Sequence, residues 1–174
     1  MSSSGVALSQ TTILVDTNVI IEAVRAGCWN ALTGGARVET VEECRDEAQR
    51  GDGTRKGYVP VTPDHLSRLF AIHPVSRLAR ARLAAQYPDA SSMDTGERDL
   101  FAHALERAAE SVWFLNSPDI ASVRAAVVLR LEDRLCSLGG LMKQLGARPR
   151  TALRSHHEEA WLSRYRTQFL LDRR

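Results

Sequence analysis

The stretch 13–22 constrains this chain most strongly, because an apolar run leads directly into an aspartate. Three consecutive apolar residues, Ile13 to Val15, are typical of a strand buried on both faces, as in a parallel sheet. Asp16 then falls at the carboxyl end of that strand, the edge where ligands and catalytic groups collect in open α/β sheets. Thr17 or Asn18 can cap a following helix. Asp16 is either a functional carboxylate or only a helix cap or turn residue.

A second segment repeats this arrangement. Residues 112–115 predict another buried strand, and a polar turn from Asn116 to Asp119 separates it from a helix over 120–135. Pro118 restricts the preceding residue to extended geometry, which favours a turn there rather than an earlier helix start. The sequence therefore predicts that this turn lies at the same sheet edge as Asp16.

The rest of the chain predicts an α/β fold with a helical, basic C-terminal extension. We expect residues 1–136 to form one α/β domain with a loose tail over 1–10, and residues 137–174 to pack on that domain. Chain breaks are expected at Gly34-Gly35 and Gly139-Gly140. The expected strands are 12–16 and 37–40, with an extended segment at 58–62, and the expected helices are 18–32, 41–50, 64–72, 75–86, 97–109, 141–147 and 156–171.

Charge is unevenly distributed along the chain. Its 174 residues carry a net charge of +2, yet residues 65–87 contain four arginines and no acid. Clustered arginines can bind phosphates, and they also occur on ordinary solvated helices. The three cysteines show no disulfide or metal-thiolate pattern, which favours a reducing cytosol. The chain start does not resemble a signal peptide, and no apolar run approaches membrane-spanning length.

Acidic residues recur at matching places. Asp16 and Asp119 each follow a strand, Glu43 lies on the helix after the second strand, and Glu97 or Asp99 begins a later helix. Several carboxylates at one sheet edge repel each other and are tolerated when a divalent cation neutralises them. Hard oxygen ligands suit Mg²⁺ or Mn²⁺, which can activate a water for attack at phosphorus.

Taken together, these motifs resemble the PIN-domain ribonuclease family, many members of which are similar to VapC-type toxins. The resemblance covers about residues 12–130 and implies a three-layer α/β/α sandwich with a central, mainly parallel sheet and a Mg²⁺- or Mn²⁺-dependent endoribonuclease site. Four segments carry it: 14–18, 41–44, 96–99 with Ala102 and Ala104, and 114–119 with Ala125-Ala126.

The resemblance also implies roles for individual residues. Asp16, Glu97 and Asp119 would hold the metal, Asp99 would assist or replace Glu97, and Glu43 would be a further catalytic acid, with Glu42 one residue away as the alternative register. Asn18 and Asn116 would be supporting polar neighbours. Family members usually have an acid near position 116, so the uncharged Asn116 is a departure that weakens one ligand.

The predicted function is therefore divalent-metal-dependent hydrolysis of RNA phosphodiester bonds, as the toxin of a toxin–antitoxin pair in the cytoplasm. Candidate partners are the RNA substrate, a protein antitoxin and a second copy of the chain, and no membrane is expected. The RNA backbone would be held by Arg68, Arg77, Arg80 and Arg82. Two alternatives stay open: a catalytically weak or inactive PIN-fold nucleic-acid-binding or scaffold protein, and a DNA-directed nuclease.

Overall fold

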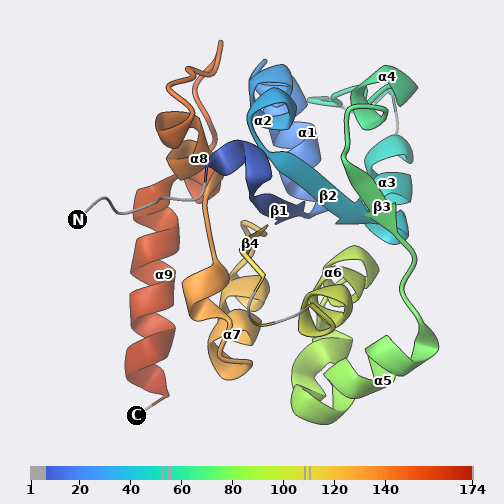
Figure 1. The fold of residues 1–174 in the computed structure, drawn as a ribbon, viewed down its shortest axis with the longest axis vertical. Helices are drawn as coiled ribbons and strands as arrows, with labels where there is room; N and C mark the ends of the chain where they lie inside the picture. Colours follow the sequence, from blue (N-terminus) through green and yellow to red (C-terminus); the bar gives the residue numbers. More distant parts are fainter. Residues whose placement is uncertain (1–6, 52, 55, 108, 110, 174) are drawn as a thin grey trace.

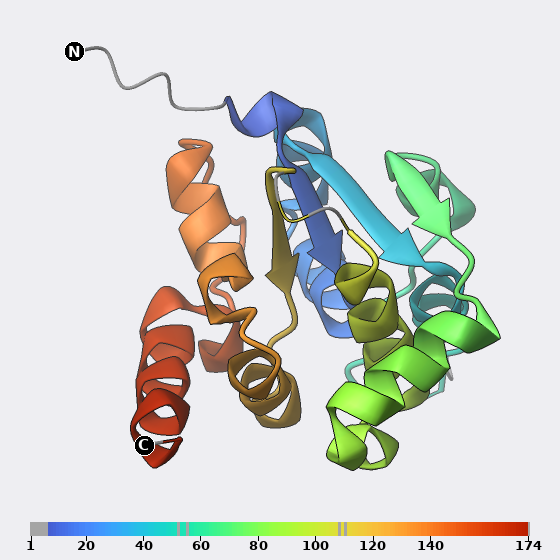
Figure 2. The ribbon, with the colours of Figure 1, turned by 60° about the horizontal axis from the view of Figure 1, so that its bottom comes forward.

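Four parallel strands form the centre of the computed structural model, which describes residues 7–51, 53–54, 56–107, 109 and 111–173. In these parts of the chain the strand order is β3-β2-β1-β4, and Figure 2 shows the arrowheads pointing the same way. The sequence-based prediction of an α/β fold with a mainly parallel sheet is confirmed. The strands are β1 (Thr12–Val15), β2 (Arg37–Val41), β3 (Ala71–His73) and β4 (Trp113–Asn116).

Helices cover both faces of this sheet (Figure 1). One hydrophobic cluster packs α5, α6, α7 and α9 on one face, and a second packs α1, α2 and α8 on the other. The helices are α1 (Thr17–Arg25), α2 (Trp29–Gly35), α3 (Glu42–Gln49), α4 (Pro63–Leu66), α5 (Arg77–Gln86), α6 (Thr95–Leu105), α7 (Ile120–Val128), α8 (Leu138–Gln144) and α9 (Glu159–Asp172).

Strand β1 is buried along its whole length because both of its faces are covered. Leu14 belongs to the cluster under α6 and α7, whereas Ile13 and Val15 belong to the cluster under α1 and α2. Side chains alternate between the two faces of a strand, so an apolar residue is needed at each position. The uninterrupted apolar run before Asp16 is explained by this two-sided burial.

Three predicted element boundaries were wrong. The helix expected over 18–32 is two helices, because Gly27 between them adopts a φ of 69° that a helix does not allow. The helix expected over 120–135 ends at Val128, and Arg130 follows with a φ of 58°. The break expected at Gly139-Gly140 is instead the first turn of α8, whose N-cap Ser137 accepts a hydrogen bond from Gly140 N at 3.0 Å.

The largest correction concerns β3. The helix expected over 64–72 is the short α4 followed by a strand, and Ala71–His73 pairs in parallel with Glu39–Val41. A short apolar run cannot be assigned to helix or strand by periodicity alone, and here pairing with β2 decided the outcome. The extended segment expected at 58–62 forms no regular strand.

The C-terminal helices pack against the same core. Leu141 of α8 lies in the cluster with α1, and Phe169 of α9 lies in the cluster with α7. Glu22 of α1 is fully buried and accepts hydrogen bonds from the Arg25 guanidinium and, at 2.7 Å, from Arg154 N. Part of the expected loose tail lies outside the described residues, and Leu8–Gln10 forms a 3₁₀ turn. None of the described helices is long and apolar enough to cross a membrane.

Candidate active site at the carboxyl edge of the sheet

Asp16 lies where β1 ends and α1 begins. Its side chain caps α1, because Oδ1 accepts a hydrogen bond from Val19 N at 2.9 Å. Asp16 is only 1% exposed, and no Lys, Arg or His in the described parts of the chain forms a salt bridge with it. The sequence placed Asp16 correctly at this edge, as a cap that is also a buried, unpaired carboxyl group.

Two serines connect Asp16 to Glu97. Ser117 Oγ lies 2.7 Å from Asp16 Oδ2, Ser122 Oγ lies 2.9 Å from Ser117 Oγ, and Glu97 Oε1 lies 3.0 Å from Ser122 Oγ. Ser117 follows β4, Ser122 lies on α7 and Glu97 lies on α6. The fold therefore brings two of the predicted acids into one buried hydrogen-bonded chain.

Counting protons shows how this chain must be protonated. Three oxygen–oxygen contacts need three protons, and the hydroxyls of Ser117 and Ser122 supply one each. The third proton must come from a carboxyl group. With that proton on Glu97, Glu97 donates to Ser122, Ser122 donates to Ser117, and Ser117 donates to Asp16. All three contacts are satisfied together when the two carboxyl groups share one proton.

Burial and repulsion account for this shared proton. Burial raises the pKa of Asp16 from its ordinary value of 3.8 to about 7, although hydrogen bonds from Ser117 and Val19 oppose the shift. Burial also raises the pKa of Glu97 from 4.5 to about 8, and the charges of Asp94, Asp119 and Asp16 add to this rise. Burial beside other carboxylates is therefore the physical cause of both raised pKa values.

Two more aspartates stand at helix starts around Glu97. Asp94 caps α6, with Oδ1 accepting from Glu97 N at 2.8 Å, and Asp119 caps α7, with Oδ1 accepting from Ala121 N at 2.7 Å. Asp119 is half-buried and Asp94 is exposed. Three helices, α1, α6 and α7, therefore begin beside the same group of acids, each capped by an aspartate.

Glu47, which was not predicted, is the acid of α3 that reaches this region. Its Oε2 accepts a hydrogen bond from Thr17 Oγ1 at 2.7 Å, and its Oε1 accepts one from Gly96 N at 3.1 Å. A Cβ at position 96 would lie 2.4 Å from Glu47 Oε2, so this approach requires glycine there. Helical spacing could have found Glu47, because it lies one turn after the buried Cys44 on the inward face of the helix.

Glu43 is half-buried on α3. Its carboxylate pairs with Arg50 at 3.1 Å on the same helix. The alternative register at Glu42 does not help, since Glu42 is exposed at the start of α3. Neither residue is connected to Asp16 by a contact that the structure shows, and we leave both out of the proposed site.

Asp99 is buried but already paired. Arg80 of α5 donates from Nε and Nη2 to the two Asp99 oxygens, each at 2.6 Å. This bidentate pair joins α5 to α6, and it occupies the Asp99 carboxylate and the Arg80 guanidinium together. A metal role of Asp99 or an RNA contact of Arg80 would require this ion pair to open, so both stay predictions.

Neither predicted asparagine supports the acids through its side chain. Asn116 pairs in register with Val15, which places it on the α1 side of the sheet, and its Nδ2 is buried without a hydrogen-bond partner. The next residue, Ser117, makes the contact with Asp16 instead. Asn18 has an exposed side chain, and its backbone N–H lowers the pKa of Asp16 slightly.

The remaining predicted arginines lie on the surface. Arg68 and Arg77 are exposed, and Arg82 lies 3.6 Å from Glu106 in an exposed salt bridge. Arg77 begins α5, which packs along α6. Arg68 and Arg77 are thus the arginines of this group that the structure leaves available to a phosphate backbone.

The most closely spaced group of possible metal ligands lies away from Asp16, Glu97 and Asp119. Among the residues that the structure describes, one group of three His, Cys, Asp or Glu side chains has ligand atoms all within 4.8 Å of one another: Glu39, His73 and His103. Asp16, Glu97 and Asp119 are spaced more widely than this.

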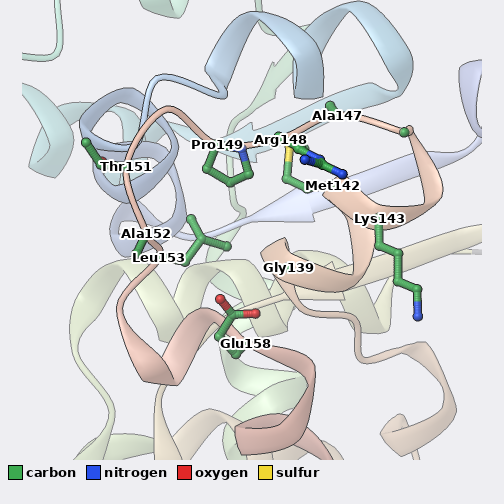
Figure 3. A pocket seen from close by; sticks show the side chains of 11 residues that line it. Gly139, Met142, Lys143, Ala147, Arg148, Pro149, Thr151, Ala152, Leu153 and Glu158 are labelled. Atoms are coloured by element: carbon green, nitrogen blue, oxygen red, sulfur yellow. The ribbon is translucent and has the colours of Figure 1, made fainter.

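A cavity of about 500 Å³ lies between α8 and the loop that follows it, where Glu158 points towards Gly139 (Figure 3).

Comparisons with known proteins give no further guide. No protein-family model matches the chain, and no curated protein and no solved structure shows a significant match to it.

Proposed function

We propose that this chain is a PIN-like endoribonuclease that hydrolyses RNA phosphodiester bonds with Mg²⁺ or Mn²⁺. The observation that carries this proposal is the pair of buried, uncompensated carboxyl groups of Asp16 and Glu97, joined through two serines at the carboxyl edge of a parallel sheet. Perturbed acids of this kind are concentrated at functional sites. Asp119, at the start of α7, completes the proposed set of acids.

The residues present fit a hard divalent cation. The site offers carboxylate and hydroxyl oxygens, and within the described residues no salt bridge neutralises Asp16, Glu97 or Asp119. Mg²⁺ usually keeps several of its waters and binds proteins through one or two carboxylates. The wide spacing of the three acids therefore suits a partly hydrated ion, which Asp16, Glu97 and Asp119 would hold.

A bound cation would supply an activated water and stabilise the negative charge that develops at phosphorus. The chain's own residues prepare that position. Val19 N and Ser117 hold the Asp16 carboxylate in one orientation, and Ser122 does the same for Glu97. The proton that the two acids share leaves when both become anionic, so the full negative charge of the site is available to a cation.

RNA is the proposed substrate because of the resemblance to PIN-domain ribonucleases, and the exposed Arg68 and Arg77 would hold its backbone. A role as a cytoplasmic toxin, with a protein antitoxin and a second copy of the chain as partners, belongs to the same proposal. A gene for a small DNA-binding antitoxin beside this one would support the toxin role.

One observation favours a second candidate, a non-catalytic nucleic-acid-binding or scaffold protein on the same fold. The hydroxyls of Ser117 and Ser122 stand between the two acids, and together they satisfy the buried carboxyl groups without any ion. A site that is complete in this way can be a purely structural polar network.

Cleavage and metal-binding assays separate these candidates. Wild type, Asp16→Asn and the exposed control Asp133→Asn would be incubated with labelled single-stranded RNA or DNA, with Mg²⁺, with Mn²⁺ and with chelator. The nuclease proposal predicts cation-dependent RNA cleavage that Asp16→Asn abolishes and Asp133→Asn retains. Cleavage of DNA alone would assign the chain to the DNA-directed alternative.

Calorimetry with Mn²⁺ adds a readout that does not depend on finding the right substrate. Repeated near neutral pH in buffers of different ionisation enthalpy, it should show release of about one proton per ion, the proton shared by Asp16 and Glu97. A folded wild type that neither binds Mn²⁺ nor cleaves RNA would establish the scaffold instead.

A further inference from the structure

A second polar cluster lies under α6, away from the acids. Glu39 of β2, His73 at the end of β3 and His103 of α6 place their ligand atoms within 4.8 Å of one another. Glu39 is only 4% exposed, and the two histidines are half-buried. The three residues come from elements that the fold alone brings together (Figure 1).

We propose that Glu39, His73 and His103 form a binding site for a transition-metal ion of the Zn²⁺ class. Two imidazole nitrogens and one carboxylate oxygen are a ligand set that Zn²⁺ accepts and that Mg²⁺ does not favour. This site is separate from the carboxylate site in ligand chemistry and in position. The proposal therefore stands whether or not the chain is a nuclease.

The contacts of the two histidines support this assignment. His73 Nε2 lies 2.8 Å from Glu39 Oε2, and the rings of His73 and His103 are stacked with centroids 4.2 Å apart and planes at 19°. Buried ring nitrogens normally have a hydrogen-bond partner, yet His103 Nε2 is buried without one. A metal ion would give this nitrogen the partner that the protein does not provide.

The distances require a small adjustment. A tetrahedral Zn²⁺ with bonds of about 2.0–2.1 Å separates its ligand atoms by about 3.3 Å. The contact between His73 and Glu39 would therefore open slightly as the ion replaces the shared proton, and His103 would move closer. A metal ion lies in the plane of each imidazole that binds it, so the stacked rings of His73 and His103 would also have to turn out of their nearly parallel arrangement.

Arg107 is the cation that pairs with Glu39 in this structure. Its two terminal guanidinium nitrogens donate to Glu39 Oε2 at 2.9 and 3.0 Å, while Thr12 Oγ1 donates to Oε1 at 3.2 Å. A metal ion would compete with Arg107 for the Glu39 carboxylate. The Thr12 hydroxyl is neutral and can stay as a support for the ligating group.

An ion here would join the edge strand to the helix that carries Glu97. In the described sheet β3 has three residues and pairs with β2 alone, so few backbone bonds hold it. His103 lies six residues after Glu97 on α6, about 9 Å along the helix axis. Binding would therefore stabilise β3 and fix the position of α6 without entering the carboxylate site.

The test is a Zn²⁺ titration of the full chain against a chromogenic chelator, with Co²⁺ absorption to report tetrahedral coordination. With Mg²⁺ in excess to occupy the carboxylate site, we expect one Zn²⁺ per chain in the wild type. Binding should be weaker by at least about 100-fold in His103→Gln and in Glu39→Gln. The controls His156→Gln and Asp133→Asn should bind as the wild type does. Circular dichroism of each variant establishes that the fold is kept.

Removal of the Arg107 charge, which competes for Glu39, is an independent test of the Zn²⁺ site. Arg107→Gln should bind Zn²⁺ several-fold more tightly, because Glu39 is then free of its salt bridge. No saturable binding by the wild type would overturn the proposal and leave a structural Glu39–His73–Arg107 network. Binding that is unchanged in a folded His103→Gln would overturn it as well.

Discussion

Replacement of Asp16 by asparagine tests the buried charge at the centre of the proposed site. Asparagine keeps the shape and the cap, because its Oδ1 can accept the hydrogen bond from Val19 N that Asp16 accepts now. Its amide can donate to Ser117, which then donates to Ser122, so the hydrogen-bonded chain survives. The change therefore removes a charge and little else, and we expect the metal-free protein to become more stable above acidic pH.

The size of the gain follows from the pKa of Asp16. Burial raises that pKa from 3.8 to about 7, so ionised Asp16 opposes folding. The protonated form of Asp16 stabilises the folded state. This contribution is fully present below the pKa of Asp16 in the unfolded chain, and it is lost as the pH rises through the pKa of Asp16 in the folded protein. At about 1.4 kcal/mol for each tenfold change in the proton equilibrium, the complete loss is about 4 kcal/mol. The Asp16→Asn variant has no such loss, so its gain should grow from about zero at about pH 3 to about 4 kcal/mol at about pH 8.

Urea unfolding in the presence of chelator, repeated across this pH range, measures the gain directly. The exposed Asp133→Asn is the matched control, and it should change the free energy of unfolding little at any pH. A gain of this size also corresponds to about 10 °C in melting temperature for a chain of this length. A gain that is equal at both ends of the pH range, or absent at the alkaline end, would refute the assignment of Asp16 as a buried unpaired carboxyl group.

Three further changes test neighbouring parts of the proposal. Asp119→Asn should keep the cap of α7 and weaken Mn²⁺ binding. Asp119→Ala should weaken Mn²⁺ binding too, and should also lower the free energy of unfolding by about 1 kcal/mol because the cap is lost. If calorimetry gave both variants the Mn²⁺ affinity of the wild type, Asp119 would be excluded from the site. Arg80→Ala should lower the free energy of unfolding by about 2–3 kcal/mol, because Asp99 is left buried without its partner, and an unchanged urea midpoint would contradict this. Replacing Arg68 and Arg77 together by alanine should flatten the salt dependence of RNA binding by about 0.7 in log–log slope for each phosphate that the protein no longer neutralises, and an unaltered slope would assign both to ordinary surface.

Much of the sheet could be predicted because its strands are buried on both faces. The strands expected at 12–16, 37–40 and 112–115 agree with β1, β2 and β4 to within one residue at each end. The placement of Asp16 and Asp119 followed from the same pattern, since both come directly after such a strand or its turn. A short run of apolar residues that ends in a polar turn is typical of a buried strand, so the position of each strand end could be predicted.

The residues that connect the acids could not be predicted in the same way. Ser117 and Ser122 have no distinctive spacing, and their importance comes from the 2.9 Å contact between them, which forms when α7 docks against the end of β4. Glu43 and Glu47 lie on one helix and differ in direction, and the choice between them depends on which face packs inward. The strand β3 was missed because its three residues gain their structure from pairing with β2.

The burial of Glu22 decides where this chain can be divided. Arg154 N reaches that carboxylate from a part of the chain more than one hundred residues away, and Glu22 lies on the helix that Asp16 begins. A protein ending near residue 136 would lose this donor and expose the back of α1 to water. The segment after residue 136 therefore supports α1, and a chain that ended there would lose a hydrogen bond that holds the helix capped by Asp16.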